Sequence, residues 1–90
     1  MSEKFHVLLH PKAAKELDGL RPEIRERVKS ALKELATSPG NGTPLNPSRF
    51  RRIRIGDYKA IYELDDREKK VIVLLVGHRK NIYDDFRRLF

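Results

Sequence analysis

The order of apolar and polar positions divides the chain into a helical first half and a strand-rich second half. The stretch KFHVLLH at 4–10 is predicted to be a first strand, with Phe5, Val7 and Leu9 on one face. A short helix is predicted to begin at Pro11, where the missing N–H costs nothing, and to end near Gly19. A longer helix begins at Pro22, and its apolar residues recur at helical spacing to form one core-facing stripe. These are Ile24, Val28, Ala31, Leu32 and Leu35.

The second half has the pattern of a β-hairpin followed by one more strand. Residues 38–48 hold three prolines and two glycines, which predicts a loop between the two halves. Strands are then predicted at 49–55 and 58–64, joined by a two-residue turn. The run VIVLLVG at 71–77 is apolar on both faces, which is typical of a central strand covered on both sides.

The tail at 78–90 has the pattern of a short helix with Asn81 as its N-cap. We expect its apolar residues, Phe86, Leu89 and Phe90, to cover the core. The resulting order, β-α-α-β-β-β, predicts an α+β fold. This fold would be a small antiparallel sheet with two N-terminal helices packed on one face and a short C-terminal helix.

Composition and charge narrow the class of protein. The length fits a single domain, 1–90. The sequence has no cysteine, no apolar run that could span a membrane and no signal-peptide pattern, so we expect a soluble cytoplasmic protein without a membrane partner. Its net charge is +7. The cations cluster at 49–54 and 78–80, which predicts an anionic partner, either nucleic acid or an acidic protein.

A two-residue turn at Gly56-Asp57 fixes which hairpin residues lie opposite each other. The predicted pairs are Ile55–Tyr58, Arg54–Lys59, Ile53–Ala60 and Arg52–Ile61. The like-charged pair Arg54–Lys59 is unfavourable by roughly a few tenths of a kcal/mol. With Arg52, it puts three cations on one face, which we interpret as an anion site. The other face is apolar and can rest on the helices; it carries Ile53, Ile55, Tyr58, Ala60 and Tyr62.

The second cationic cluster, in GHRK, follows directly after the apolar strand. Because the strand ends at its glycine, the three polar side chains emerge at the end of the sheet. If this strand pairs with the second hairpin strand, Lys59 and Arg79 can approach each other. Arg49 and Arg51 have the wrong parity or lie near a strand end, and we interpret them as surface charge.

The stretch RRIRIGDYKAIYELDDREKKVIVLLVGHRKNIY, residues 51–83, resembles the RelE/ParE toxin superfamily, and its RelE branch in particular. The similar elements are a basic strand, a G-x-Y-[RK]-x-x-Y hairpin, a valine-rich strand, and G-[HK]-R followed by a tyrosine. The helical half also has the family's length and order. The resemblance implies the toxin of a type II toxin–antitoxin pair. Such a toxin is a metal-independent endoribonuclease that needs no cofactor and inhibits translation by cutting mRNA in the ribosomal A site.

The resemblance also implies partners and site residues. The partners are the ribosome with its mRNA and an acidic RelB-like antitoxin that wraps the toxin in a heteromeric complex, and the free toxin is expected to be a monomer. Guanidiniums suit the charge that develops on phosphoryl oxygens, so we expect Arg54 and Arg79 to grip the phosphate. The predicted catalytic residues are Arg54, Arg79, Tyr83 and Lys59. The predicted RNA-binding residues are Arg52, Lys80 and His78.

The identity of the general base stays open. Tyr83 ranks first, because nearby cations would lower its pKa from about 10, although it could instead stack on a base of the codon. His78 ranks second, because its pKa lies nearer neutrality. Lys59 and Lys80 are further candidates, since a cation cluster lowers a lysine pKa.

Two other functions also stay open. A ParE-like toxin would poison DNA gyrase by binding, without nuclease chemistry, and such relatives typically lack or alter the Arg79 and Tyr83 pair. A catalytically weak homologue is the third possibility. Many relatives have arginine where this chain has Lys59, and an ammonium is the poorer bidentate clamp.

Overall fold

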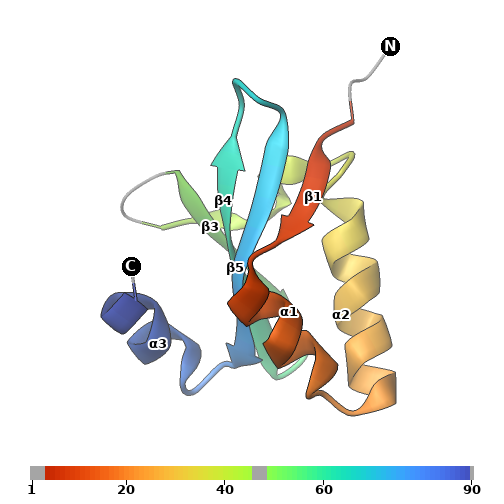
Figure 1. The fold of residues 1–90 in the computed structure, drawn as a ribbon, viewed down its shortest axis with the longest axis vertical. Coiled ribbons are helices and arrows are strands. Elements are labelled where there is room, and N and C mark those ends of the chain that lie inside the picture. The colour runs from red at the N-terminus through yellow and green to blue at the C-terminus, as the bar shows by residue number, and fades with distance from the viewer. Residues whose placement is uncertain (1–3, 46–48, 90) are drawn as a thin grey trace.

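The computed structural model describes residues 4–45 and 49–89 (Figure 1). The predicted order of helices and strands is confirmed. One short strand that the pattern did not indicate, β2, lies inside the predicted loop at 38–48, whose residues 46–48 lie outside the described part of the chain. The elements are β1 (His6–Leu9), α1 (Pro11–Asp18), α2 (Pro22–Glu34), the 3-10 turn η1 (Pro39–Asn41), β2 (Thr43–Pro44), β3 (Phe50–Ile55), β4 (Tyr58–Asp65), β5 (Lys70–His78) and α3 (Ile82–Leu89).

Within the described residues, five strands form one sheet in the order β1-β5-β4-β3-β2. β5 lies inside this sheet with a neighbour on each side, which explains its nearly continuous apolar run. β1 pairs with β5 in parallel, from His6 opposite Lys70 to Leu9 opposite Val73, and the other pairings are antiparallel. The α+β fold is confirmed. The parallel pair at the edge is a feature that the predicted antiparallel sheet did not include.

The register of the strands decides which side chains share a face. The β3–β4 hairpin has the predicted register in all four of the predicted pairs. Between β4 and β5 the register shifts, because Ile61 lies opposite Leu75 while Tyr62 lies opposite Val73. This leaves Leu74 as an extra residue in β5, a β-bulge.

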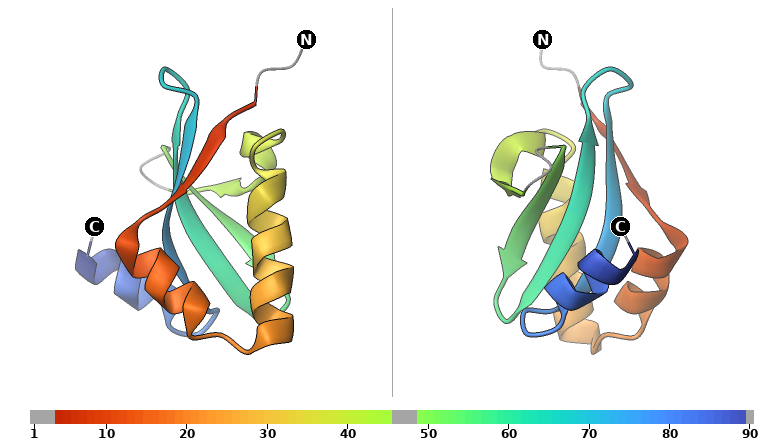
Figure 2. Two further views of the ribbon diagram at one scale, coloured as in Figure 1. Left: turned by 45° about the vertical axis from the view of Figure 1, so that its right-hand side comes forward. Right: turned by 90° about the vertical axis from the view of Figure 1, so that its left-hand side faces the viewer.

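The two faces of the sheet carry two hydrophobic cores. Helices α1 and α2 cover the face that carries the buried Ala60, Tyr62 and Val73, as predicted. Figure 2 shows α3 on the other side of the strands from α2. The buried side chains on the α3 side are Phe50, Ile61, Leu74, Leu75 and Ile82.

Helix α3 covers this second core with only part of its apolar surface. Phe86 packs edge-on against Phe50, with 5.3 Å between the ring centres. Leu89, which was expected to cover the core, is instead 48% exposed, because the last turn of α3 runs out beyond the strands (Figure 1). Phe90 lies outside the described residues.

The loop before β3 is fixed from the α1/α2 side of the sheet. The buried phenol of Tyr62 donates to the carbonyl oxygen of Pro39 at 2.7 Å and accepts from the N–H of Gly42 at 3.0 Å. Arg51 donates from Nη1 to the carbonyl oxygens of Gly42, at 2.8 Å, and Gly40, at 3.3 Å. The interpretation of Arg51 as surface charge is therefore wrong, because its strand parity directs it to this loop.

Candidate functional site

Three of the predicted site residues meet on the α3 side of the sheet. The phenolic oxygen of Tyr83, in the first turn of α3, accepts hydrogen bonds from Nη1 of Arg52 and from Nζ of Lys59, the latter at 3.2 Å. Both cations also lie against the tyrosine ring, with Cζ of Arg52 5.6 Å and Nζ of Lys59 4.8 Å from its centre. Such contacts stabilise cations over an aromatic ring. The sequence places them together because Arg52 and Lys59 share a face of the hairpin and α3 folds back onto that face.

The two cations change the acidity of Tyr83. Partial burial would raise the pKa of its phenol, but the hydrogen bonds from Arg52 and Lys59, together with their positive charges, lower it below the usual value of 10.0. Hydrogen bonds and nearby cations both favour the charged form of an acidic group. The phenolate is therefore more accessible here than in free tyrosine.

Tyr83 is held in place by its neighbours on α3. Ile82 is 1% exposed and Phe86 packs against Phe50, so both sides of the tyrosine are anchored in the second core. The predicted N-cap, Asn81, directly precedes the helix, and its carbonyl oxygen accepts from the N–H of Asp85 at 3.2 Å.

Arg54 and Arg79 lie around the turn that joins β3 to β4. Nε of Arg54 donates to the carbonyl oxygen of Gly56 at 3.0 Å. The backbone N–H of Arg79 donates to the carbonyl oxygen of Asp57 at 2.9 Å. Nε of Arg79 also lies 3.9 Å from the carboxylate oxygen Oδ1 of Asp57. Both arginines are exposed at the end of the sheet that carries Lys59.

The strand of Lys59 is paired with the strand that precedes Arg79, as expected, but the side chain of Arg79 has another partner. Lys59 lies opposite Gly77, two residues before Arg79, so the predicted strand pairing holds. The side chain of Arg79, however, pairs with Asp57. Sequence reasoning did not single out Asp57 in this role. The available signal was an acidic residue in a two-residue turn, with clusters of cations at 49–54 and 78–80.

His78 and Lys80 do not join the cluster around the phenol of Tyr83. Lys80 is exposed in the turn after β5. His78 lies opposite Tyr58, and paired residues share a face, so its ring lies on the α1/α2 side of the sheet. The two rings make an edge contact with 5.5 Å between their centres. The sheet therefore separates the imidazole from the phenol of Tyr83.

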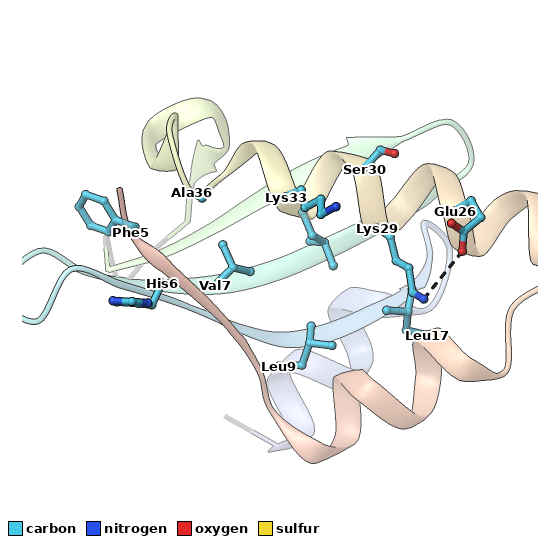
Figure 3. Close-up of a pocket in the computed structure, with 11 residues that line it drawn as sticks. Phe5, His6, Val7, Leu9, Leu17, Glu26, Lys29, Ser30, Lys33 and Ala36 are labelled. Carbon is cyan, nitrogen blue, oxygen red and sulfur yellow. Dashed lines mark ion pairs between the residues drawn. The ribbon is translucent and has the colours of Figure 1, made fainter. Parts of the chain in front are cut away.

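A separate hollow of about 660 Å³ lies between β1, α1 and α2. Figure 3 shows Val7, Leu9 and Leu17 around it, with Lys29 reaching across from α2. Lys29 is paired with Glu26 at 3.8 Å. This hollow is lined by both apolar and charged side chains and lies across the sheet from Tyr83.

Over residues 4–45 and 49–89, no three His, Cys, Asp or Glu side chains gather as metal ligands do. In the same part of the chain, no helix is both long and apolar enough to pass through a bilayer.

Comparison with known families decides the class of protein. The family model of the ParE toxin of type II toxin–antitoxin systems, parDE, matches residues 7–83. The chain belongs to this family. It is therefore a toxin of the type II toxin–antitoxin class, as the resemblance to the RelE/ParE superfamily implied. No curated protein sequence matches it.

The solved structures with a similar fold include RelE toxins, alone or with their antitoxins. The toxin–antitoxin complex RelBE2 from Mycobacterium tuberculosis has a TM-score of 0.77 at 29% identity, over 84% of this chain and 99% of that chain. The RelB–RelE complex from Methanococcus jannaschii has a TM-score of 0.69 at 28% identity, over 88% and 98%. A mutant E. coli RelE in the free state has a TM-score of 0.78 at 21% identity, over 97% and 99%, and shows the fold alone.

Proposed function

We propose that this toxin is an endoribonuclease that cleaves mRNA in the ribosomal A site, without a metal ion, and thereby inhibits translation. The observation that carries the proposal is the phenol of Tyr83, whose pKa is lowered by hydrogen bonds and charges from two cations in spite of its partial burial. A group with this chemistry can take a proton from a ribose hydroxyl and sits among charges that favour phosphate.

The reaction would use the nucleophile that RNA already carries. The phenolate of Tyr83 accepts the proton of the 2′-hydroxyl, and the 2′-oxygen forms a bond to the adjacent phosphorus. The bond from phosphorus to the 5′-oxygen breaks, and that oxygen takes up a proton. The products are a 2′,3′-cyclic phosphate and a 5′-hydroxyl.

The cations would bind the phosphate, donate a proton to the leaving oxygen and stabilise the phenolate. Arg54 and Arg79 are exposed, and among the described residues their side chains pair with oxygens of the Gly56-Asp57 turn, so each can exchange that contact for a phosphoryl oxygen. Guanidiniums stay charged and offer paired donors to such oxygens. Arg79 is also the candidate proton donor to the leaving oxygen. Arg52 and Lys59 hold the phenolate and extend the positive surface, and Lys80 contacts the RNA backbone.

The partner of the free toxin would be an acidic RelB-like antitoxin. The net charge of +7 favours an acidic chain, and the relatives from M. tuberculosis and M. jannaschii were solved as toxin–antitoxin complexes. Association with such a chain neutralises the cations that the RNA would otherwise contact.

A second candidate function is poisoning of DNA gyrase. The family model that matches the chain is named for ParE, and a ParE-like toxin would act by binding alone. The phenol of Tyr83 would then have no proton to transfer. Gyrase supercoiling measured with the purified toxin distinguishes the two functions.

The test of the proposed function is cleavage of mRNA on translating ribosomes by the purified toxin. Wild-type protein should cut within the A-site codon, and replacement of both Arg54 and Arg79 by alanine should abolish the cuts. Arg67→Ala, in the exposed turn between β4 and β5, removes a guanidinium at the far end of the hairpin and should cut as wild type does. Cleavage that survives the double substitution contradicts the proposed roles of these arginines.

A further inference from the structure

The turn after β5, which carries Arg79 and Lys80, is held by three hydrogen bonds. The N–H of Arg79 donates to the carbonyl oxygen of Asp57 at 2.9 Å. The N–H of Lys80 donates to Nδ1 of His78 at 3.3 Å, and the N–H of Asn81 donates to the carbonyl oxygen of His78 at 3.0 Å. Two of the three bonds therefore end on His78.

The imidazole of His78 is oriented for this role. Its ring is half-buried and packs edge-on against Tyr58 on the α1/α2 side of the sheet, at an interplanar angle of 76°. Its Nδ1 accepts from the N–H of Lys80, two residues later in the chain, as a side-chain oxygen does in an Asx turn. A ring that accepts at Nδ1 is neutral and carries its proton on Nε2.

The same device occurs elsewhere in the chain. Nδ1 of His10 accepts from the N–H of Lys12 at 3.1 Å and caps the first turn of α1. In both places histidine supplies an acceptor to the backbone at the start of a turn. At His10 the result is a helix N-cap, whereas at His78 it is a turn whose side chains are the cations of the candidate site.

We infer that His78 is a positioning residue for the cleavage reaction. Its Nδ1 fixes the backbone of the turn so that Arg79 and Lys80 project from the end of β5 toward the RNA backbone. The inference rests on the proposed function. It assigns no proton transfer to His78, because a general base must reach the hydroxyl it deprotonates and this ring lies across the sheet from Tyr83.

Two amide substitutions separate positioning from other roles. In His78→Asn, the side-chain oxygen occupies nearly the place of Nδ1 and can accept from Lys80. In His78→Gln, the amide reaches the place of Nε2 and that bond is lost. We expect Gln to lower the single-turnover rate of cleavage about fivefold, the loss of one hydrogen bond, and Asn to recover most of that loss. His10→Gln, the matched control, removes the equivalent bond at α1 and should keep the wild-type rate.

Rate outcomes decide the inference directly. Recovery by Asn but not by Gln supports it. A Gln variant as active as the Asn variant, or more active, overturns it, because His78 would then act through Nε2 or would not matter.

A second readout needs no catalysis. Hydrogen exchange of the Lys80 amide should be faster in His78→Gln than in wild type and near wild type in His78→Asn. In the neutral imidazole of the wild-type protein, nitrogen NMR should place the proton on Nε2, and a neutral ring with its proton on Nδ1 overturns the inference. If wild-type toxin cleaves no mRNA, the proposed function fails, while the Lys80 exchange rates still show whether His78 holds the turn.

Discussion

Nζ of Lys59 lies 3.2 Å from the phenolic oxygen of Tyr83, although one residue is in the hairpin and the other follows the last strand. The contact joins a cation predicted from the hairpin register to a tyrosine predicted from a family resemblance. Arg52 donates to the same oxygen, so the phenol accepts from two cations at once. This arrangement has direct consequences for acidity and reactivity.

Tyr83 should titrate below free tyrosine. In Lys59→Met, one hydrogen bond and one charge that favour the phenolate are lost, so the pKa of Tyr83 should rise toward or above 10.0. Carbon NMR of the ring during a pH titration measures this value. Lys29→Met removes a lysine on α2, across the sheet, and should leave the titration of Tyr83 where it is. An unchanged pKa in Lys59→Met would show that the contact does not govern the phenol.

The rate of cleavage should rise with pH. Because the reactive form is the phenolate and its pKa is lowered, the rate should increase about tenfold per pH unit at low pH and level off near that pKa. In Lys59→Met the phenolate forms at higher pH, so the bend in the profile should move upward. Single-turnover rates across a pH series test this. A rate that falls as pH rises would indicate that Tyr83 acts as its protonated form.

One tyrosine-to-phenylalanine substitution should lower the rate of cleavage, and another should lower the stability of the fold. Tyr83→Phe keeps the ring and removes the proton acceptor, so cleavage should fall at least about a hundredfold, the usual size of general-base catalysis, with little loss of stability. Tyr62→Phe breaks the bonds to Pro39 and Gly42 and should lower the free energy of unfolding by about 1–3 kcal/mol while the folded protein still cleaves. Denaturant unfolding and cleavage rates measured on both variants distinguish a residue of the reaction site from one that stabilises the fold. Equal cleavage by Tyr83→Phe and wild type would remove Tyr83 from the mechanism.

Gly42 should tolerate no side chain. A Cβ at this position would lie 2.6 Å from the carbonyl oxygen of Arg52 and 2.6 Å from the phenolic oxygen of Tyr62. We expect Gly42→Ala to lower the free energy of unfolding by about 1–3 kcal/mol, since neither the strand nor the buried ring can move freely. Gly40→Ala, where a Cβ meets nothing within 4 Å, is the matched control and should unfold near wild type. Equal stability of the two variants would show that the loop adjusts.

Local patterns predicted the hairpin and the face on which its cations lie. A two-residue turn leaves one register for the strands, so the Arg54–Lys59 pair followed from the sequence alone and the structure has it. Arg49, near the strand end, is exposed as expected. The position of Tyr83 came from the resemblance, since nothing in the spacing between the hairpin and α3 fixes where that helix folds back.

Features that depend on long-range packing were not predictable from local pattern. The parallel pairing of β1 with β5 joins strands that no short turn connects. The contact of Arg51 with Gly42 depends on a loop whose path the sequence does not fix. The exposure of Leu89 depends on where the sheet ends relative to α3. The ring of His78 could be placed only once β4 and β5 were paired, because pairing with Tyr58 decides its face.

The most direct test of the central claim is the chemistry of the RNA ends made on translating ribosomes. Purified wild-type toxin should produce cuts within the A-site codon that leave a 2′,3′-cyclic phosphate upstream and a 5′-hydroxyl downstream. These ends should be absent with Tyr83→Phe. Intact mRNA together with inhibited gyrase supercoiling, or cuts that leave a 5′-phosphate, would contradict the account.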